Sequence, residues 1–426
     1  MNRFKERIIY WSQLLLVPIY GLSFLMPRDK NIWLFGSTFG RRFADNPRYL
    51  YLYVNDLIRK ENSIDGEAPI SGETSTKVHP IWISHNKKIV SWLNEKGYEA
   101  YYYHSFKGIW MALRAGVYVF DNYSKDINFW QSGGAVKINL WHGSGNKLTN
   151  HDNEFDKVRH PKNVWQKWTT WLRRLSDEKP SHYILSTSEA KAKENMSAFQ
   201  CDRNHMIING QPRNDMLISN DEYEINNLLT DYEKENLKRI KDDKSNGSKI
   251  ICFMPTFRPS EKKFFETMDF ERFDKYLEER NYKLYVKPHP KSRILKELEA
   301  LNYKNIVPIK SEVDVYTFLN QVDFLIADYS SAYTDFMLLE RPVVAFWFDE
   351  EEYATQNRES YIKMEEYMPE VVARNMPELM QSIDEIFEND FHYEARMKSR
   401  DRYFDKIDGF YSRDMYESIQ KIINDK

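Results

Sequence analysis

A histidine ends a short apolar run in KINLWHG (137–143), and further small residues follow it. An imidazole can accept a proton from a hydroxyl group at physiological pH, which makes His142 a candidate base. Gly143 has no side chain, which lets a substrate approach the backbone closely. Two interpretations are open for this motif alone: a catalytic base in a cleft, or a histidine in a structural turn.

A second polar group follows the strand-like run HMIIN, in NGQPRNDML (209–217). Arg213 and Asp215 carry donors and acceptors that suit a phosphate or a hydroxyl group. The same residues also suit the start of a helix, where an asparagine or aspartate side chain often caps the first turn. On its own, this motif favours the helix start over a binding site.

Two more apolar runs end beside cations. Thr256 and Arg258 follow KIICFMP, and a guanidinium at a strand end suits either a bidentate phosphate contact or an ion pair. Lys287 and His289 lie in VKPHP, where two prolines restrict the backbone at the strand exit. A lysine and a histidine held in this way form a credible anion site.

The run DFLIADYSS contains Asp328 at its end, and Ser330 and Ser331 then open a helix. Helix N-termini bind anions through free N–H groups and the helix dipole, and serine hydroxyls add donors. A purely structural cap is the alternative, and one position can serve both purposes. The chain has neither GxxxxGK[ST] nor GxGxxG after its first strand, which excludes a P-loop nucleotidase and disfavours a dinucleotide oxidoreductase.

These polar groups all follow strands of an alternating strand–helix pattern, which indicates parallel sheets with crossover helices. We expect strands at 31–37, 78–84, 98–103, 116–122, 137–143, 182–188, 249–257, 282–290, 305–310, 323–331 and 341–349. A strongly charged segment, 221–248, is the expected linker between Rossmann-like domains at 29–220 and 249–395, and a helical segment, 396–426, follows. Ligands of open α/β sheets lie beyond the carboxyl ends of the strands, so we expect a cleft between the two domains.

Composition limits the classes of protein to consider. The chain has 426 residues, enough for two domains of ordinary size. Its net charge of −3 lacks the basic signature of a nucleic-acid-binding protein, so we expect no nucleic-acid partner. The two cysteines, Cys201 and Cys252, are far apart, which argues against a disulfide framework and against a cysteine-rich metal site.

The first 28 residues differ from the rest. Arg3, Lys5 and Arg7 precede an uncharged run, 8–26, that is about as long as a minimal membrane span. Three interpretations are open: a helix lying in the membrane interface, a helix packed on the protein's own surface, and a true span. The basic start and the aromatic residues favour the first, so we expect residues 1–28 to associate with the cytoplasmic face of a membrane.

The motifs in their order resemble those of the CDP-glycerol glycerophosphotransferases, which are teichoic-acid-type primases and polymerases with a GT-B fold. The matching motifs are WHG, GQPRND, PTFR, KPHP, DYSSAYTDF and RPVVAFWFD, and IDGFYSR (407–413) is similar to a further segment of that family. The resemblance runs from about Pro27 to Arg413. Ser144 and Gly145 depart from the threonine and proline that the family often has after WHG, which leaves the acceptor contacts open.

The resemblance implies a role for each matching residue. His142 would be the general base that takes the proton of an acceptor hydroxyl as its oxygen attacks the β-phosphorus, and CMP would leave. Gly143 and Ser144 would lie on the acceptor side. The residues expected to bind the donor are Arg213, Asp215, Thr256, Arg258, Lys287, His289, Asp328, Ser330, Ser331, Asp408 and Arg413.

The function implied is transfer of glycerol phosphate from CDP-glycerol to a lipid-linked glycan or polyol-phosphate acceptor, in teichoic acid or capsule-type polymer synthesis. The enzyme would be peripheral, on the cytoplasmic side of the cell membrane. Fixed cationic side chains can neutralise a diphosphate without a protein-bound metal, and Mg²⁺ accompanying the diphosphate is an open alternative. The rival interpretations are CDP-ribitol as donor, a nucleotide-sugar glycosyltransferase on the same fold, and a non-catalytic membrane-bound binding protein.

Overall fold

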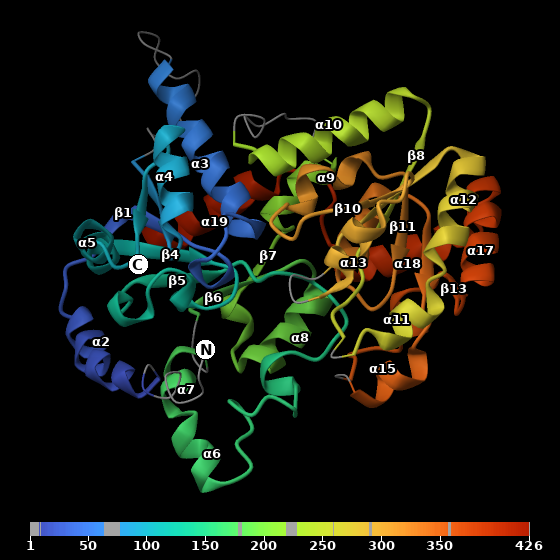
Figure 1. The fold of residues 1–426 in the computed structure, drawn as a ribbon. Coiled ribbons are helices and arrows are strands. Elements are labelled where there is room, and N and C mark those ends of the chain that lie inside the picture. The colour runs from blue at the N-terminus through green and yellow to red at the C-terminus, as the bar shows by residue number, and fades with distance from the viewer. Residues whose placement is uncertain are drawn as a thin grey trace.

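The computed structural model describes residues 8, 10–63, 77–177, 181–218, 228–258, 260–288, 292–356 and 359–425. Within these residues the chain forms two all-parallel β-sheets, of seven and six strands, which lie side by side in Figure 1. We refer to the sheet nearer the N-terminus and its helices as the first domain, and to the other sheet and its helices as the second domain.

The first sheet has the strand order β3-β2-β1-β4-β5-β6-β7. Its strands are β1 (Asp29–Phe35), β2 (His79–Ser84), β3 (Ala100–Tyr102), β4 (Ala115–Phe120), β5 (Val136–Asn139), β6 (Tyr183–Ser186) and β7 (Met206–Ile208). Its longer helices are α3 (Asp45–Ser63), α4 (Lys87–Glu95), α5 (Phe106–Arg114) and α8 (Glu189–Phe199). The order reverses beside β1, and ligands of such sheets bind at this kind of reversal.

The second sheet has the strand order β10-β9-β8-β11-β12-β13. Its strands are β8 (Lys249–Phe253), β9 (Tyr282–Val286), β10 (Ile306–Pro308), β11 (Phe324–Ala327), β12 (Val343–Phe346) and β13 (Val371–Ala373). The longer helices of this domain are α10 (Asp231–Ser245), α12 (Phe270–Arg280), α13 (Ile294–Leu301), α17 (Met376–Glu388) and α18 (Tyr393–Tyr403).

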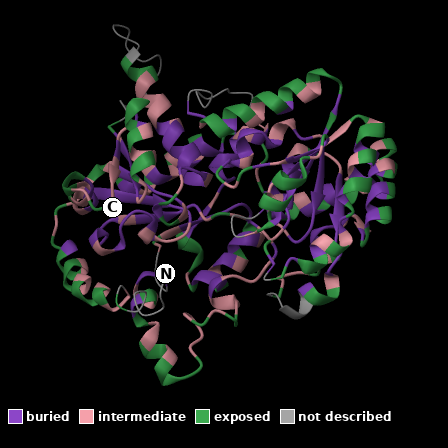
Figure 2. Cartoon of the chain, viewed as in Figure 1, coloured by how far each residue is buried: buried purple, intermediate pink, exposed green. Residues whose placement is uncertain are grey.

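Three inner strands are buried along their whole length, as parallel strands covered on both faces are expected to be. Every residue of β4, β11 and β12 is buried, and Figure 2 shows this buried interior in both sheets. One cluster of buried apolar side chains continues from Val119 and Leu140 of the first domain to Tyr285 and Leu325 of the second. The two domains therefore share a core, which resists large changes in their separation.

The expected α/β class is confirmed, and each expected strand occurs within the described residues. The expected segments extend beyond the strands at the carboxyl ends. β5, for example, ends at Asn139, because the Asn139 side chain accepts a hydrogen bond from the Trp141 N–H and Trp141 adopts a φ of 48°. The four edge strands, β3, β7, β10 and β13, are each three residues long, and β13 has no counterpart among the expected strands.

The charged segment 221–248 is not simply a linker. It contains α10, which begins with a capping box between Thr230 and Glu233 and packs against β8. The buried apolar residue of α10 is Ile240, while most of the charged residues of this helix are exposed. High charge in this segment therefore marks the solvent face of a helix of the second domain, while residues 219–227 lie outside the described part of the chain.

The C-terminal helix α19 (Tyr411–Asn424) returns to the first domain and packs against α3. Asp215 holds the start of this helix, because its carboxylate accepts hydrogen bonds from the N–H groups of Tyr411 (2.8 Å) and Ser412 (2.9 Å). The side chain of Asp215 is buried. Residues about 200 positions apart in sequence are therefore joined at the edge of the first domain.

The N-terminal segment forms a short turn, Gln13–Leu16, and the helix α2 (Val17–Ser23). The Tyr20 ring stacks on Phe129 at a centroid distance of 4.5 Å, and Trp11 packs on Trp168 at 4.4 Å. One side of the segment is therefore packed on the protein surface, as in the second of the three interpretations above. Among the described residues, no helix has the length and apolar character needed to cross a membrane.

Candidate active site between the two sheets

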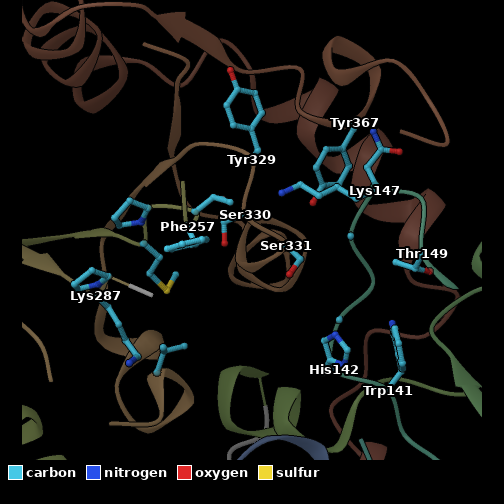
Figure 3. A pocket seen from close by; sticks show the side chains of 18 of the residues that line it. Trp141, His142, Lys147, Thr149, Phe257, Lys287, Tyr329, Ser330, Ser331 and Tyr367 are labelled. Carbon is cyan, nitrogen blue, oxygen red and sulfur yellow. The ribbon is translucent and has the colours of Figure 1, made fainter. Parts of the chain in front are cut away.

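A cavity of about 500 Å³ lies between the two domains. The first domain contributes Arg42, Trp141, His142, Gly143, Gly145, Asn146, Lys147, Thr149, Lys191 and Asn195 to its lining. The second contributes Met254, Pro255, Thr256, Phe257, Lys287, Pro288, Ser311, Val315, Tyr329, Ser330, Ser331, Met364 and Tyr367. In Figure 3, His142 and Trp141 lie on one side of the cavity, Lys287 and Phe257 lie on the other, and the two serines lie between.

His142 lies on the segment that leaves β5, and its ring is held in one orientation. Nδ1 lies 3.1 Å from the carbonyl oxygen of Asp121. A carbonyl oxygen can only accept, so we assign the hydrogen to Nδ1, which leaves Nε2 with a free lone pair. The Asn46 side chain also donates to the carbonyls of Leu140 (3.2 Å) and Trp141 (2.8 Å). The imidazole is thereby presented to the cavity in the form that can accept a proton.

Lys287 is the main cation on the opposite wall. It follows β9, and its Nζ donates to the carbonyls of Ser311 (3.2 Å) and Lys310 (3.4 Å). Burial and the nearby Arg42 guanidinium lower the pKa of Lys287 to about 8. A cation that has lost part of its hydration in this way gains more from an incoming anion than an exposed lysine would.

Ser330 and Ser331 follow β11 and precede the short helix α14 (Ala332–Phe336). Their position requires glycine in the facing loop. A Cβ on Gly145 would lie 2.8 Å from the Ser331 Cβ, and one on Gly143 would lie 3.2 Å from the Ser331 Oγ. The backbone after His142 therefore packs directly against the serine-bearing segment of the other domain.

Thr256, expected at the donor site, lines the cavity, whereas Arg258 and Asp328 lie behind it. The Arg258 guanidinium donates to Asp349, to Asp328 (2.8 Å) and to the Thr256 carbonyl (2.7 Å). Asp328 in turn accepts from the Thr256 N–H (2.7 Å) and hydroxyl (2.8 Å). Arg258 was expected to contact phosphate, but here it is committed to internal partners and supports the wall that Thr256 forms.

Three other expected residues also differ from their expected place at the cavity surface. Arg213 is buried among Asp45, Asp335 and the His142 carbonyl. Asp215 is buried at the start of α19. Ser144, expected on the acceptor side, accepts hydrogen bonds from Thr187 and Gln211, both at 2.9 Å, and is buried. Hydrogen-bond partners that are distant in sequence turn these polar side chains inward.

The C-terminal candidates lie on the surface. Asp408 and Arg413 are exposed, and Arg413 pairs with Asp414 and lies over the Phe410 ring. Neither is part of the cavity lining, because α19 and the turn before it pack on the first domain. His289 lies outside the described residues. Donor binding by these three residues stays a prediction.

Several residues that line the cavity were not predicted from the sequence. Arg42 follows β1, so inspecting the end of the first strand would have found it. Lys191 and Asn195 lie one turn apart on α8, and the Lys191 Nζ donates to the Gly145 carbonyl at 3.0 Å. Which face of α8 meets the cavity is decided by packing, so no local signal pointed to these two residues.

Comparison with known proteins identifies the family of this chain. Residues 19–421 match the family described as CDP-Glycerol:Poly(glycerophosphate) glycerophosphotransferase. The chain belongs to this family. The resemblance seen in the ordered motifs is thereby confirmed over most of the chain.

Relatives within this family include the teichoic acid ribitol-phosphate polymerase TarK of Staphylococcus aureus, 30% identical over 219 residues. That alignment covers 50% of this chain and 40% of TarK, so the match spans well under half of that relative. A teichoic acid glycerol-phosphate transferase of the same organism is 24% identical over 404 residues, 92% of this chain and 94% of the relative. A solved structure of the wall teichoic acid polymerase TagF has the same fold, with a TM-score of 0.72 at 21% identity, and covers 100% of this chain and 98% of TagF.

We predict that a methyl group on Gly145 disturbs the contact with Ser331. Gly145→Ala forces the loop and Ser331 apart, at an overpacking cost of about 1–3 kcal/mol. The unfolding midpoint measured by calorimetry should fall by about 2–8 °C. Gly143→Ala is the graded control. Its Cβ would lie 3.2 Å from the rotatable Ser331 hydroxyl and at least 3.6 Å from other atoms, so it should lower the midpoint less. Equal midpoints for the two variants would contradict the packing described.

We also predict that binding of CDP-glycerol weakens above pH 8. Lys287 loses its proton around that pH in the free protein, so the cation expected to meet the diphosphate is lost as the pH rises. Titration calorimetry between pH 7 and 9.5 should show affinity falling by up to about tenfold per pH unit above 8, with proton uptake on binding. Lys287→Arg, which stays charged, should flatten this dependence. An unchanged pH profile in that variant would assign the effect to another group.

Proposed function

We propose that this protein transfers glycerol phosphate from CDP-glycerol to a hydroxyl group of a lipid-linked glycan or polyol-phosphate acceptor, with release of CMP. The observation that carries the proposal is the arrangement of one cavity. A histidine with a free Nε2 lies on one side, Lys287 lies on the other, and Ser330 and Ser331 lie between them. The two sheets facing this cavity are the arrangement of a GT-B-like enzyme. Family membership and the named activities of the relatives support the same reaction.

The proposed reaction is a phosphoryl transfer in which His142 acts as the base. The acceptor oxygen forms a bond to the β-phosphorus while Nε2 of His142 takes its proton. The bond from that phosphorus to the bridging oxygen breaks, and CMP carries the electron pair away. Lys287 and the serine hydroxyls meet the charge that the phosphoryl oxygens carry in the transition state, which is the main demand of phosphoryl transfer.

The imidazolium that forms on His142 has a carboxylate nearby. Asp45 interacts electrostatically with His142, and Arg213 holds it at 2.6 Å. Burial raises the pKa of Asp45, and Arg213 opposes that effect. An ionised Asp45 would stabilise the charged imidazole after proton transfer, since an opposite charge at short range favours the charged form.

The assay should also test whether the reaction needs a metal ion. Among the described residues, no group of three or more His, Cys, Asp or Glu side chains is placed to hold a metal ion. No step above passes through a metal ion. Mg²⁺ bound to the diphosphate itself is compared by running the reaction with the ion and with a chelator.

CDP-ribitol is the second candidate donor, because the relatives at 30% identity are named ribitol-phosphate polymerases. The deciding experiment incubates the protein with a lipid-linked acceptor and CDP-glycerol, CDP-ribitol or a UDP-sugar in turn. Mass analysis of the product and assay of released CMP then identify the donor. We expect CMP and a mass increase of one glycerol phosphate. Turnover of the UDP-sugar alone would overturn the proposal in favour of a glycosyltransferase.

His142→Ala should lower the rate of CMP release by at least about 10²-fold, as expected when a general base is lost. Binding of CDP-glycerol should persist, because Lys287 and the serines are untouched. His392→Ala is a matched control, since its Nδ1 also pairs with a carbonyl oxygen, that of Pro369 at 2.9 Å, outside the cavity. Full activity of the His142 variant would leave only a binding role for the cavity.

We further propose that the enzyme docks on the cytoplasmic side of the cell membrane through one apolar face, where its lipid-linked acceptor lies. The exposed side chains of this apolar face are Leu15, Leu22, Leu25, Phe155, Val164, Trp165 and Trp168. The leucines belong to the N-terminal segment, the valine and the tryptophans belong to the helix α6 (Val164–Thr169), and Phe155 lies in the segment before α6. The helix α7 (Trp171–Asp177) follows α6 directly. In Figures 1 and 2, α2 and α6 extend from the same side of the molecule with much of their surface exposed.

Two observations join these segments into one face. Trp11 contacts Trp168, and the Leu172 N–H donates to the Tyr10 hydroxyl at 3.2 Å. Basic residues, Lys167, Arg173 and Arg174, accompany the apolar ones. Tryptophan and basic side chains together suit the headgroup region of an anionic bilayer.

If this apolar face contacts the membrane, the double variant Val164→Ser/Trp165→Ser should bind membranes less tightly. Each large side chain withdrawn from the bilayer forgoes about 1.5–3 kcal/mol, so affinity for phosphatidylglycerol vesicles should fall by at least about tenfold in sedimentation assays. Phe391→Ser removes an equally exposed aromatic residue of the second domain and should not change binding. If both variants sediment like the wild type, the membrane contact lies elsewhere.

A further inference from the structure

A single buried arginine joins the His142 loop to the second domain. One terminal nitrogen of Arg213 donates to the Asp45 carboxylate (2.6 Å) and to the His142 carbonyl (3.0 Å). The other donates to Asp335 of the second domain at 2.7 Å. Its guanidinium carbon also lies 4.6 Å from the centroid of the Tyr316 ring. One planar cation thus contacts both domains directly beneath the cavity.

The partner carboxylate is part of the segment that carries the serines. Asp335 lies in α14, four residues after Ser331, and also accepts hydrogen bonds from Asn214 (3.0 Å) and the Tyr316 hydroxyl. It is fully buried. A continuous set of contacts therefore runs from the His142 backbone through Arg213 to Asp335 in α14, the helix that follows the serines.

The far end of the same loop is tied to the second domain as well. The Asn146 side chain donates to the Ile362 carbonyl (2.8 Å) and accepts from the Ile362 N–H (3.0 Å), as a paired strand would. Its backbone carbonyl accepts from the Tyr361 N–H at 2.8 Å. The loop from His142 to Asn146 is therefore fixed at both ends by groups whose positions depend on the second domain.

We propose that Arg213 is a positioning residue, which sets the separation of His142 from Ser330 and Ser331 and does not touch the donor. This inference rests on the proposed function, in which His142 is the base. Arginine suits the role because its planar fork reaches Asp45, Asp335 and a carbonyl at once, whereas a lysine ammonium is a single point charge. Buried charges of this kind specify one arrangement of their partners, because any other arrangement leaves a charge unpaired.

The test compares Arg213→Lys with Arg48→Lys. Arg48 is an equally buried arginine between the domains and pairs with Glu233 (2.8 Å) and Asp314 (3.6 Å). Among the described residues, none of its hydrogen bonds or ion pairs reaches the His142 loop. CMP release from CDP-glycerol should show kcat reduced at least about tenfold in Arg213→Lys, since small misplacements of reacting groups cost up to about 10²-fold. The donor KM should stay within about twofold of the wild-type value, and Arg48→Lys should keep its kcat.

Two outcomes would overturn the assignment. A raised donor KM with unchanged kcat would indicate direct donor binding by Arg213. An equal loss of kcat in both lysine variants would indicate a general effect of loosening the domain interface. Asp335→Asn, which removes only the charge of the second-domain partner, gives the same comparison if Arg213→Lys does not fold.

Hydrogen exchange measures the positioning itself and needs no turnover. Backbone amides of residues 142–148 should exchange faster in Arg213→Lys and Asp335→Asn than in the wild type, and at the wild-type rate in Arg48→Lys. Unchanged exchange in the first two variants would refute the positioning role. If the wild type releases no CMP, the proposed function fails, and the exchange data alone decide the role of Arg213.

Discussion

The backbone that follows His142 packs against Ser331 of the other domain, and the cavity has its shape because of that contact. Glycine at 143 and 145 permits an approach that a methyl group would prevent at the second of these positions. A shared apolar core on either side of this contact keeps the two sheets at one separation. The distance between His142 and the wall that the second domain contributes to the cavity is thus a property of the interface, and neither domain determines it alone.

The polar residues near the cavity divide into a lining layer and a supporting layer. His142, Lys287 and the serines line the cavity, whereas Arg213 and Arg258 lie behind it with carboxylate partners. Burying such charges is costly unless every partner is present, so the supporting layer holds each wall in a single arrangement. The lining side chains can then meet a substrate without reorganising first, which is what transition-state stabilisation of a charged phosphoryl group requires.

The apolar face and the His142 side of the cavity both lie in the first domain. The N-terminal segment and α6–α7 are attached to the first domain, which also carries His142. A lipid-linked acceptor would reach the histidine from that side, while the donor would occupy the side formed by the second domain. This arrangement would let a water-soluble donor and a membrane-bound acceptor meet at one phosphorus atom.

The sequence alone determined the α/β class, nearly all of the strands, the family, and the residue types at the strand ends. These are local properties, since apolar runs and the residues that end them are contiguous in the chain. Tertiary structure decided which polar side chains face the cavity. Arg258 pairs with Asp349 and Asp215 holds Tyr411, and such partners lie 91 and 196 residues away. A strand-end position places a residue near the site, but only its distant partners decide whether the side chain turns toward a substrate or into the protein.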